Sequence, residues 1–582
     1  MLGGKSDQIA RDSGVTSTRG LCLQAGGNHS PISTIRNRSR ISHMETRNNE
    51  MDSTALAQYA ADEPRTSRWV VLGASLGTVF EWYDFFLYGS LATYFGIWFF
   101  PPDNQTAGLL ASLATFGAGF AVRPLGSLVF GRLGDMAGRK NTFLLTIILM
   151  GVSTAAVGVL PTFDHIGWTA PVLLVVLRLI QGLAVGGEFG GATVYIAEHC
   201  APRVRGYKTS WIQITGSAGF LLATVVIFAA RALIGPQAFA QWGWRVPFGF
   251  SLVLLAVSIW IRFKLDESPV YLKMKAAGQV SKAPLTEAFA EPRNLRAMCI
   301  ALLGGTMPLG VTSIAASVAP LILLSGPLHV DALQVYGMMA VALIVTLPLY
   351  VVFGSLSDRI GRRKVMLCGC LLALLTCYPV FSLLGRYANP GLMEFQQRVP
   401  VTVAARDCHM RFFVTPNTRL STCDKAQQFL SRAGVNYTSV PADGTDDVVT
   451  HIGTTTLTGF DEAHYRAALA AAGWTPSANP ARVDRVAVTL LLMVLLACTA
   501  MISGPMAAYL SELFPARIRY TAVSFPFHIG NGWFGGFLPL VMSALATSTG
   551  NMIAGVAYPI VMLAIAFVVG LRYMRDAPVE PM

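Results

Sequence analysis

Charged residues are scarce in this chain. Asp, Glu, Lys and Arg make up 13% of its 582 residues, whereas hydrophobic residues make up 53%. An ordinary soluble domain is about 25% charged. The apolar residues also come in separate runs of about 20, and a helix of that length crosses the hydrocarbon core of a bilayer. The composition therefore excludes a soluble protein and indicates a membrane protein with many spans.

Several motifs are absent as well. Residues 1–65 contain no apolar run that could form a signal-peptide core, and their polar composition predicts a disordered tail. The chain has no Gly-x-x-x-x-Gly-Lys-Ser/Thr motif, so nothing local supports ATP hydrolysis. The net charge of +12 is typical of basic cytoplasmic loops rather than of a nucleic-acid partner. We expect no nucleic-acid partner, no cofactor, no metal and no enzyme activity.

Twelve apolar segments are each long enough to span a membrane as a helix. They lie at 69–97, 107–130, 141–161, 169–197, 209–231, 244–263, 297–324, 332–354, 365–385, 486–510, 519–545 and 551–573. Basic connections alternate with connections that lack Lys and Arg, such as 98–106, 162–168 and 546–550. Because cytoplasmic loops carry the excess of Lys and Arg, this alternation predicts that both termini are cytoplasmic.

An internal repeat divides these segments into two halves. Gly131–Lys140 follows the second segment, and the similar Gly354–Arg363 follows the eighth, at an offset of 223 residues. The Arg-x-Arg pair that begins at Arg203 recurs at Arg517, at an offset of 314 residues. The offset grows by 91 residues between the ninth and tenth segments. We therefore expect an all-α membrane protein with two six-helix pseudo-symmetric halves and one insertion in the second.

This layout gives the expected domain organisation. It comprises a disordered cytoplasmic tail (1–65), an N-terminal six-helix half (66–263), a cytoplasmic linker (264–296), helices seven to nine (297–385), an extracytoplasmic insertion (386–485), and helices ten to twelve with the tail (486–582).

The insertion contains an apolar run around 410–414, a helical pattern from 424 to 433, strand-like segments at 450–453 and 454–458, and a helix from 461 to about 472. This order resembles a small glutaredoxin-like α/β module. Leu420 stands where a Cys-x-x-Cys motif would need its first cysteine, so thiol catalysis is not expected. Cys408 and Cys423 either form a disulfide on the oxidising side or remain two free thiols.

The ordered motifs outside the insertion resemble those of the major facilitator superfamily. Two Gly-x-Leu-x-Asp-x-x-Gly-Arg loops, after segments two and eight, carry the general resemblance. The narrower resemblance, to the metabolite:proton symporter branch, rests on Glu81–Phe85, Arg123–Gly126, Arg178–Gly182, Gly186–Phe189, Trp244–Pro247, Glu267–Pro269, Glu512–Pro515 and Arg519–Tyr520. That branch includes permeases for α-ketoglutarate, citrate, shikimate and proline/betaine, and the resemblance covers about 69–385 and 486–574. Met136 departs from the pattern, because Arg359 fills the equivalent position of the second loop.

The resemblance implies a secondary active transporter of a bacterial inner membrane. We expect proton symport of a small organic acid, similar to a di- or tricarboxylate, by alternating access in the lipid bilayer. One alternative substrate is an osmolyte such as proline or betaine. Another alternative is a transporter-like receptor that uses the outer module as a sensor. The oligomeric state stays open.

Three acidic residues inside the spans are candidates for proton coupling. Glu81 and Asp84 are three residues apart and share one helical face, so the two carboxylates should not both ionise easily. Either they exchange a proton, or they form a fixed network with Arg123 and Arg178. Glu188 lies ten residues beyond Arg178, about 15 Å along a helix, so it is a second proton site or a structural acceptor.

Arg178 is the leading candidate for binding an acidic substrate, because a guanidinium holds a carboxylate through two parallel hydrogen bonds. Arg123 is a second candidate, with a snorkelling or loop-pairing role as the alternative. Tyr83, Gln181 and Asn531 complete the expected substrate-binding set.

The cytoplasmic loops supply the expected gate. The resemblance assigns Asp135, Arg139, Asp358 and Arg362 to gating rather than to substrate binding. His528, in the eleventh segment, is expected to be a hydrogen-bonded packing residue rather than a proton carrier.

Overall fold

The structure is a computed structural model, and it describes residues 68–101, 105–137, 139–198, 200–263, 276–277, 284–406, 421–441 and 447–576. The predicted tail, the apolar run around 410–414 and Cys408 lie outside these residues. So do the side chains of Asp135, Arg139 and Glu188, although the backbone of all three is helical.

Helices cover all six predicted segments of the first half. They are α2 (Arg68–Ser90), α3 (Ala92–Trp98), α4 (Gln105–Ala121), α5 (Arg123–Ala137), α6 (Arg139–Val159), α7 (Phe163–Ile166), α8 (Thr169–Gly186), α9 (Glu188–Glu198), η1 (Pro202–Val204), α10 (Arg205–Ile234), α11 (Pro236–Ala238), the π-helix η2 (Phe239–Gly243) and α12 (Arg245–Phe263).

Helices also cover the six predicted segments of the second half. They are α14 (Pro284–Ala290), α15 (Pro292–Ala301), the π-helix η3 (Leu302–Thr306), α16 (Met307–Ala316), α17 (Val318–Ser325), α18 (Ala332–Ile360), α19 (Arg362–Ala388), α23 (Arg485–Ser503), α24 (Met506–Leu513), α25 (Arg519–Ile529), the π-helix η4 (Gly530–Gly535), α26 (Leu538–Thr549), η5 (Ala554–Val556) and α27 (Ala557–Tyr573).

Among the described residues, nine of these helices or helical runs are long and apolar enough to cross a membrane. A tenth arises if Pro236–Gly243 and Arg245–Trp260, which are bent by 61°, count as one span. Leu144–Val159 is a shorter apolar helix. Apolar side chains such as Leu233 and Val159 are 87% and 79% exposed on the outside of the bundle, which suits contact with lipid rather than water.

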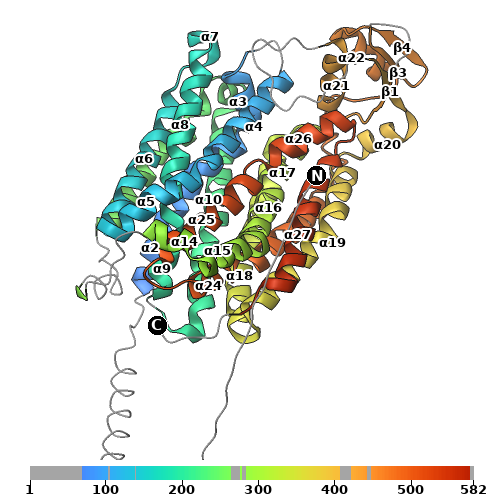
Figure 1. Cartoon of the computed structure of the whole chain (residues 1–582). Coiled ribbons are helices and arrows are strands. Elements are labelled where there is room, and N and C mark those ends of the chain that lie inside the picture. The colour runs from blue at the N-terminus through green and yellow to red at the C-terminus, as the bar shows by residue number, and fades with distance from the viewer. Residues whose placement is uncertain are drawn as a thin grey trace, which may run out of the picture. The chain divides into compact units, whose positions relative to one another are not determined.

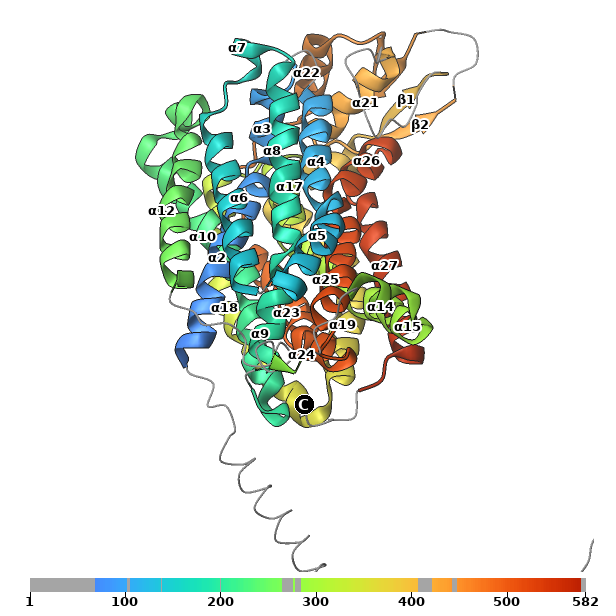
Figure 2. The same cartoon turned by 60° about the vertical axis from the view of Figure 1, so that its left-hand side comes forward.

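The two halves meet along long helix pairs. α10 packs against both α2 of its own half and α18 of the other half, and α5 packs against α25 (Figure 2). Small residues allow some of these contacts to be close. A side chain at Gly190 on α9 would lie only 1.7 Å from the hydroxyl of Ser524 on α25, so this contact requires glycine.

The insertion forms a mixed four-stranded sheet at one end of the bundle (Figure 1). Its elements are α20 (Pro390–Arg398), β1 (Val401–Ala404), α21 (Thr422–Arg432), β2 (Thr438–Val440), β3 (Val449–Ile452), β4 (Thr455–Thr458) and α22 (Glu462–Ala471). The strand order is β2-β1-β3-β4, with β1 and β2 parallel and the other pairs antiparallel. We call this segment the module, and we call the end of the bundle that carries it the module end.

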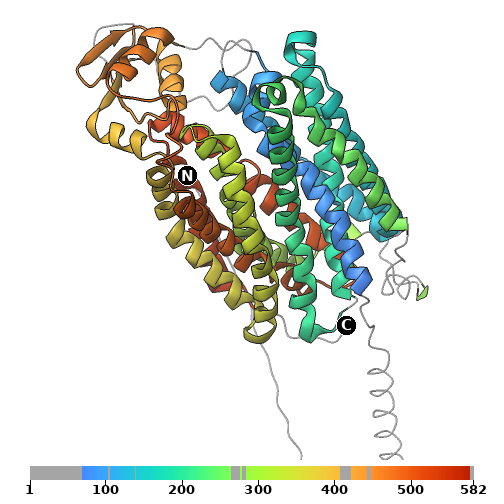
Figure 3. The same cartoon turned by 180° about the vertical axis from the view of Figure 1, so that it is seen from behind.

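The module is attached to the bundle through loops of the second half. The Tyr437 amide donates to the Gly550 carbonyl at 2.8 Å, and the Ala478 amide donates to the His329 carbonyl at 3.1 Å. The two ends of the insertion are also close together, because the Asp484 amide donates to the Tyr387 carbonyl at 3.0 Å. The insertion thus leaves and re-enters the bundle at nearly the same point (Figure 3).

Candidate functional site

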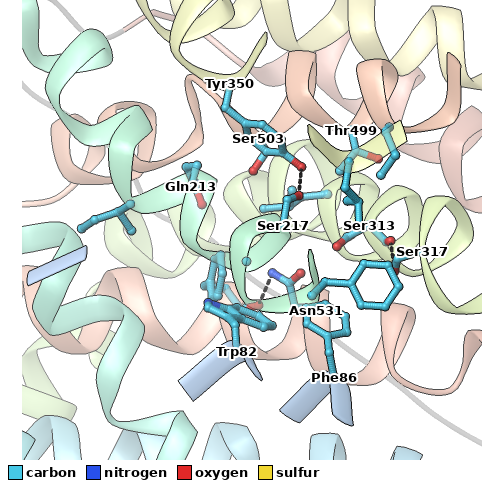
Figure 4. Close-up of a pocket in the computed structure, with 17 residues that line it drawn as sticks. Trp82, Phe86, Gln213, Ser217, Ser313, Ser317, Tyr350, Thr499, Ser503 and Asn531 are labelled. Carbon is cyan, nitrogen blue, oxygen red and sulfur yellow. Dashed lines mark hydrogen bonds between the residues drawn. The ribbon is translucent and has the colours of Figure 1, made fainter. Parts of the chain in front are cut away.

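A cavity lies between the two halves of the bundle (Figure 4). The first half contributes residues of α2 and α10. The second half contributes residues of α16, α18, α23, α25 and η4, and Ser317 between α16 and α17. The cavity volume is about 40 Å³. Because one water molecule needs roughly 10–15 Å³, this space holds a few waters, and a small organic acid fits only if the halves move apart.

The cavity lining is a mixture of apolar and uncharged polar residues among those that the structure describes. The polar lining residues are Gln213, Ser217, Ser313, Ser317, Tyr350, Thr499, Ser503 and Asn531 (Figure 4). The Ser217 and Tyr350 hydroxyls are 2.6 Å apart and join α10 of the first half to α18 of the second. Such a lining can hydrogen-bond hydroxyl, carbonyl and amide groups, but it supplies no full charge.

Only one of the predicted substrate-binding residues, Asn531, lines this cavity. The Asn531 side-chain amide donates to the Phe527 carbonyl at 3.3 Å, so a hydrogen bond to the preceding helical turn sets the orientation of the Asn531 side chain. Tyr83 faces the other way, because its hydroxyl donates to the Pro247 carbonyl on α12 at 2.6 Å. Substrate binding by Tyr83, Arg178, Arg123 and Gln181 stays a prediction.

Arg178 and Gln181 form a buried cluster inside the first half. The Arg178 guanidinium donates to the Gln181 side-chain oxygen at 2.6 Å, and the Gln181 amide donates to the Thr154 hydroxyl on α6 at 2.9 Å. Thr154 is also a hydrogen-bond partner of Asp84, whose carboxylate interacts electrostatically with Arg178 and Glu81. Two carboxylates and one arginine therefore share a buried site that α2, α6 and α8 build together.

One helix connects this cluster with the cavity. Glu81 and Asp84 are 7% and 6% exposed on α2, and both belong to the cluster. Trp82 and Phe86, on the same helix, line the cavity and stack on each other with ring centroids 5.5 Å apart. A charge change in the cluster is therefore one helical turn from the cavity wall.

Arg123 is fully buried at the start of α5, between aromatic rings. Its guanidinium carbon lies 4.0 Å from the centroid of Phe120 and 4.1 Å from that of Phe85. It also lies 5.6 Å from the ring of Trp82, which forms part of the cavity wall. The Phe85 and Phe120 centroids are themselves only 4.3 Å apart, so the two rings do not lie on opposite faces of the guanidinium. These rings attract the cation, but they accept no conventional hydrogen bond from its N–H groups.

Charged side chains join the two halves. They lie at the end of the bundle opposite the module, where Figure 2 shows α9 and α24. Asp358 closes α18 and accepts the backbone amides of Gly206 and Tyr207, at the start of α10, at 2.9 and 2.8 Å. Its carboxylate also lies 2.5 Å from the Arg362 guanidinium. A carboxylate at a helix N-terminus is favourable, so Asp358 of the second half caps a helix of the first.

A second carboxylate extends this network. Glu512 on α24 lies 3.2 Å from Arg205 of the first half and 3.3 Å from Arg362 of its own half. The side chains of Arg205 and Glu512 are 3% and 11% exposed. We call Arg205, Asp358, Arg362 and Glu512, together with the pair described next, the latch.

The remaining latch pair is Arg519–Glu198, with the two side chains 3.4 Å apart and almost fully buried. Arg519 is the repeat equivalent of Arg205, and Glu198 is the repeat equivalent of Glu512, each at an offset of 314 residues. The two ion pairs are thus reciprocal: each half gives one arginine and one glutamate. The sequence prediction named neither Glu198 nor its pairing, although the repeat offset locates it.

The remaining predicted site residues are those of the gate, Glu188 and the two cysteines. Asp358 and Arg362 belong to the latch, whereas the side chains of their repeat equivalents Asp135 and Arg139 lie outside the described residues, as does that of Glu188. Cys423 is disulfide-bonded and 1% exposed. Its pairing with Cys408 stays a prediction.

Comparisons with known proteins agree with this arrangement. Residues 70–299 match the family model described as sugar (and other) transporter. The shikimate transporter of Escherichia coli K12 is 37% identical over 345 residues, which cover 57% of this chain and 77% of that protein. The alpha-ketoglutarate permease of the same organism is 34% identical over 346 residues, covering 59% and 77%.

A solved structure shares the fold. A partially occluded inward-open conformation of the xylose transporter from E. coli superposes with a TM-score of 0.57 at 14% identity, covering 88% of this chain and 99% of that one. The family expected from the sequence is thus confirmed, and these relatives and neighbours are transporters. The chain therefore belongs to the major facilitator superfamily and, within it, to the metabolite:proton symporter family, as a multi-pass membrane transporter rather than an enzyme.

Proposed function

We propose that this protein carries a small organic acid together with a proton across a bacterial inner membrane by alternating access. In this proposal all twelve predicted segments cross the bilayer, the latch end and both termini are cytoplasmic, and the module is outside. The observation that carries the proposal is the cavity shared by both halves and held shut at one end by ion pairs between them. Rocking of the halves would break the latch and expose the cavity to the cytoplasm.

Proton coupling is assigned to Glu81 and Asp84. Their carboxylates share a buried site with Arg178, so protonation of one changes the charge balance of the whole cluster. Since α2 carries both these carboxylates and the cavity-lining Trp82, a proton can alter the cavity wall without touching the substrate. Glu188 remains a further candidate for this role.

Two observations support an organic acid as the substrate. Arg178 and Arg123 are buried near the cavity wall, and a buried guanidinium favours a carboxylate as its partner. Relatives of 34–37% identity are a shikimate transporter and an alpha-ketoglutarate permease, both named for acids.

A zwitterionic osmolyte is the second candidate substrate. The uncharged lining of the cavity favours it, because a zwitterion has no net charge to neutralise. A proline/betaine transporter of E. coli K12 is 34% identical over 329 residues.

Uptake into proteoliposomes tests the proposal. With an inward proton gradient, the wild-type protein should accumulate a labelled organic acid, whereas Asp84→Asn and Glu81→Gln should lose accumulation and retain exchange of labelled for unlabelled acid. Full gradient-driven accumulation by both variants would refute the coupling assignment. Accumulation of betaine alone would replace the acid by the osmolyte.

A further inference from the structure

Arg123 and His528 are buried side chains, one cationic and one titratable, that belong to neither the latch nor the carboxylate cluster. Both are 0% exposed. Within the described part of the chain, the three guanidinium nitrogens of Arg123 and both ring nitrogens of His528 have no hydrogen-bond partner. Buried polar groups are nearly always paired, so two neighbouring groups with every nitrogen unpaired indicate a position built for something else.

The two residues come from opposite halves and face each other. α5 and α25 pack together, and a side chain at Gly131 would lie 3.5 Å from the Thr521 hydroxyl. Further along, the Trp533 indole donates to the Ala121 carbonyl at 3.1 Å. The two helices are therefore antiparallel, and Arg123 lies opposite His528. An electrostatic interaction between the two side chains agrees with this register.

This position adjoins the cavity. Trp82 separates the two spaces, since its ring lines the cavity and lies 5.6 Å from the Arg123 guanidinium. Phe527 and Asn531, which flank His528 on its helix, line the cavity as well. His528 also precedes the π-helix η4, and π-helical turns are frequent at functional sites.

The chemistry of this position fits one carboxylate. Phe85 and Phe120 pack beside the Arg123 guanidinium, and its three nitrogens have no hydrogen-bond partner among the described residues, so its N–H groups are available to bind a ligand. Arg123 interacts electrostatically with Arg178, and His528 interacts electrostatically with Arg123. The charged neighbours of this position are therefore cations. An anion there would bind in the plane of the guanidinium through two parallel hydrogen bonds, with the His528 ring as a further donor.

We propose that Arg123 and His528 form a carboxylate-binding position, and that the cavity beside it takes the hydroxyl groups of the same molecule. The ligand class is a hydroxylated monocarboxylic acid. A second carboxylate would have to enter the hydroxyl- and amide-lined cavity, which offers no cation among the described residues. This inference rests on the proposed function and replaces the di- or tricarboxylate expected from the sequence. It also makes His528 a binding residue instead of a packing one.

Thermal-shift titrations of the purified full chain test the inference with six probes: quinate, gluconate, propionate, succinate, citrate and betaine. Quinate or gluconate should stabilise the wild-type protein at lower concentration than the other four. Arg123→Gln and His528→Gln should weaken that binding about 10- to 100-fold, as the loss of a charge-assisted hydrogen bond does. Arg123→Lys should recover part of it, because lysine keeps the charge without the two-pronged geometry.

Arg485→Gln removes an arginine from an exposed position at the start of α23 and serves as the matched control. Three results would overturn the inference. They are stronger stabilisation by succinate, citrate or betaine; stabilisation by none of the probes; and binding within twofold of wild type in the Arg123 and His528 variants. If Arg123→Gln does not yield monodisperse protein, Arg123→Lys and His528→Gln decide the question.

The two proposals can fail separately. If succinate enters with protons while the Arg123 variants bind normally, symport stands and the carboxylate position falls. If hydroxy acids bind through Arg123 but cross without protons, the carboxylate position stands and symport falls.

Discussion

The carboxylate of Glu512 lies 3.2 Å from the guanidinium of Arg205 and joins the second half of the bundle to the first. The reciprocal pair, Arg519 with Glu198, makes the same connection with the roles of the halves exchanged. Because both pairs cross between halves at one end, that end cannot open without separating buried charges. Removing one partner of such a pair typically costs about 3–5 kcal/mol.

Glu512→Gln should therefore shift the protein toward a conformation that is open at the latch end. The substitution leaves Arg205 and Arg362 without their shared carboxylate. Spin labels at Arg203 and at Ala516, in a cysteine-free background, should report a larger population of long distances. Glu287→Gln is the control, because it removes a carboxylate from a pair with Arg517 whose side chains are 34% and 61% exposed, and such solvent-screened pairs contribute little. An unchanged distance distribution in Glu512→Gln would mean that the latch does not hold the halves together.

Deleting residues 391–482 should leave transport intact. The Asp484 amide already bonds to the Tyr387 carbonyl, so a short linker can close the gap. The residues lining the cavity all belong to helices outside the module. We expect gradient-driven uptake to persist and the melting temperature to fall, since loops of the second half lose their contacts with the module. Loss of uptake by a folded, monodisperse deletion variant would instead make the module part of the transport or sensing function.

Gly434→Ala should release the module from the bundle. Gly434 has a φ of +67°, and a side chain there would meet the Pro327 carbonyl oxygen at 2.0 Å. Gly473→Ala is a matched control: its φ is +96°, and nothing lies within 4 Å of the added carbon. The left-handed conformation alone costs about 1–2 kcal/mol, and only Gly434→Ala adds the clash. Limited proteolysis should cut the module faster in Gly434→Ala than in the control, and equal rates would contradict the proposed docking.

Attachment of the module should also weaken at low pH. Burial lowers the pKa of His329, which lies in the loop between α17 and α18 with its ring 6.1 Å from that of Trp474. Because the folded pKa is below the unfolded value of about 6.5, this stabilisation is complete above that pH and declines as the pH falls below it. Melting temperatures from pH 5 to pH 8 should drop more steeply for wild type than for His329→Gln. Parallel curves would exclude His329 as the cause.

Helices were the most predictable part of this fold. Long apolar runs have few alternatives in a bilayer, so each predicted segment is helical in the structure, although boundaries moved. α15, for example, begins at Pro292, five residues before the predicted segment. The first strand of the module was not predicted. The structure has β1 at Val401–Ala404, whose side chains alternate between buried and part-buried, but four residues are the shortest run in which alternation indicates a strand.

The site was predicted mainly from charged residues. For this reason the prediction included only part of the cavity and its surroundings. Intramembrane charges such as Asp84 and Arg178 stand out in the sequence because they are costly in lipid. Neutral residues such as Ser217 and Gln213 give no comparable pattern, and only the packing of the two halves places them around one cavity. Glu198 differs again, since the repeat offset from Glu512 could have identified it.

Simultaneous measurement of acid and proton entry tests the central claim most directly. Purified protein is reconstituted into liposomes that contain a pH-sensitive dye, and a labelled organic acid that binds the protein is added outside without any imposed gradient. The account predicts that acid uptake acidifies the lumen in wild type. Asp84→Asn, which retains exchange alone, should show neither net acid uptake nor acidification, because the lumen contains no acid to exchange. Acid uptake by wild type with no change in lumenal pH would contradict proton symport.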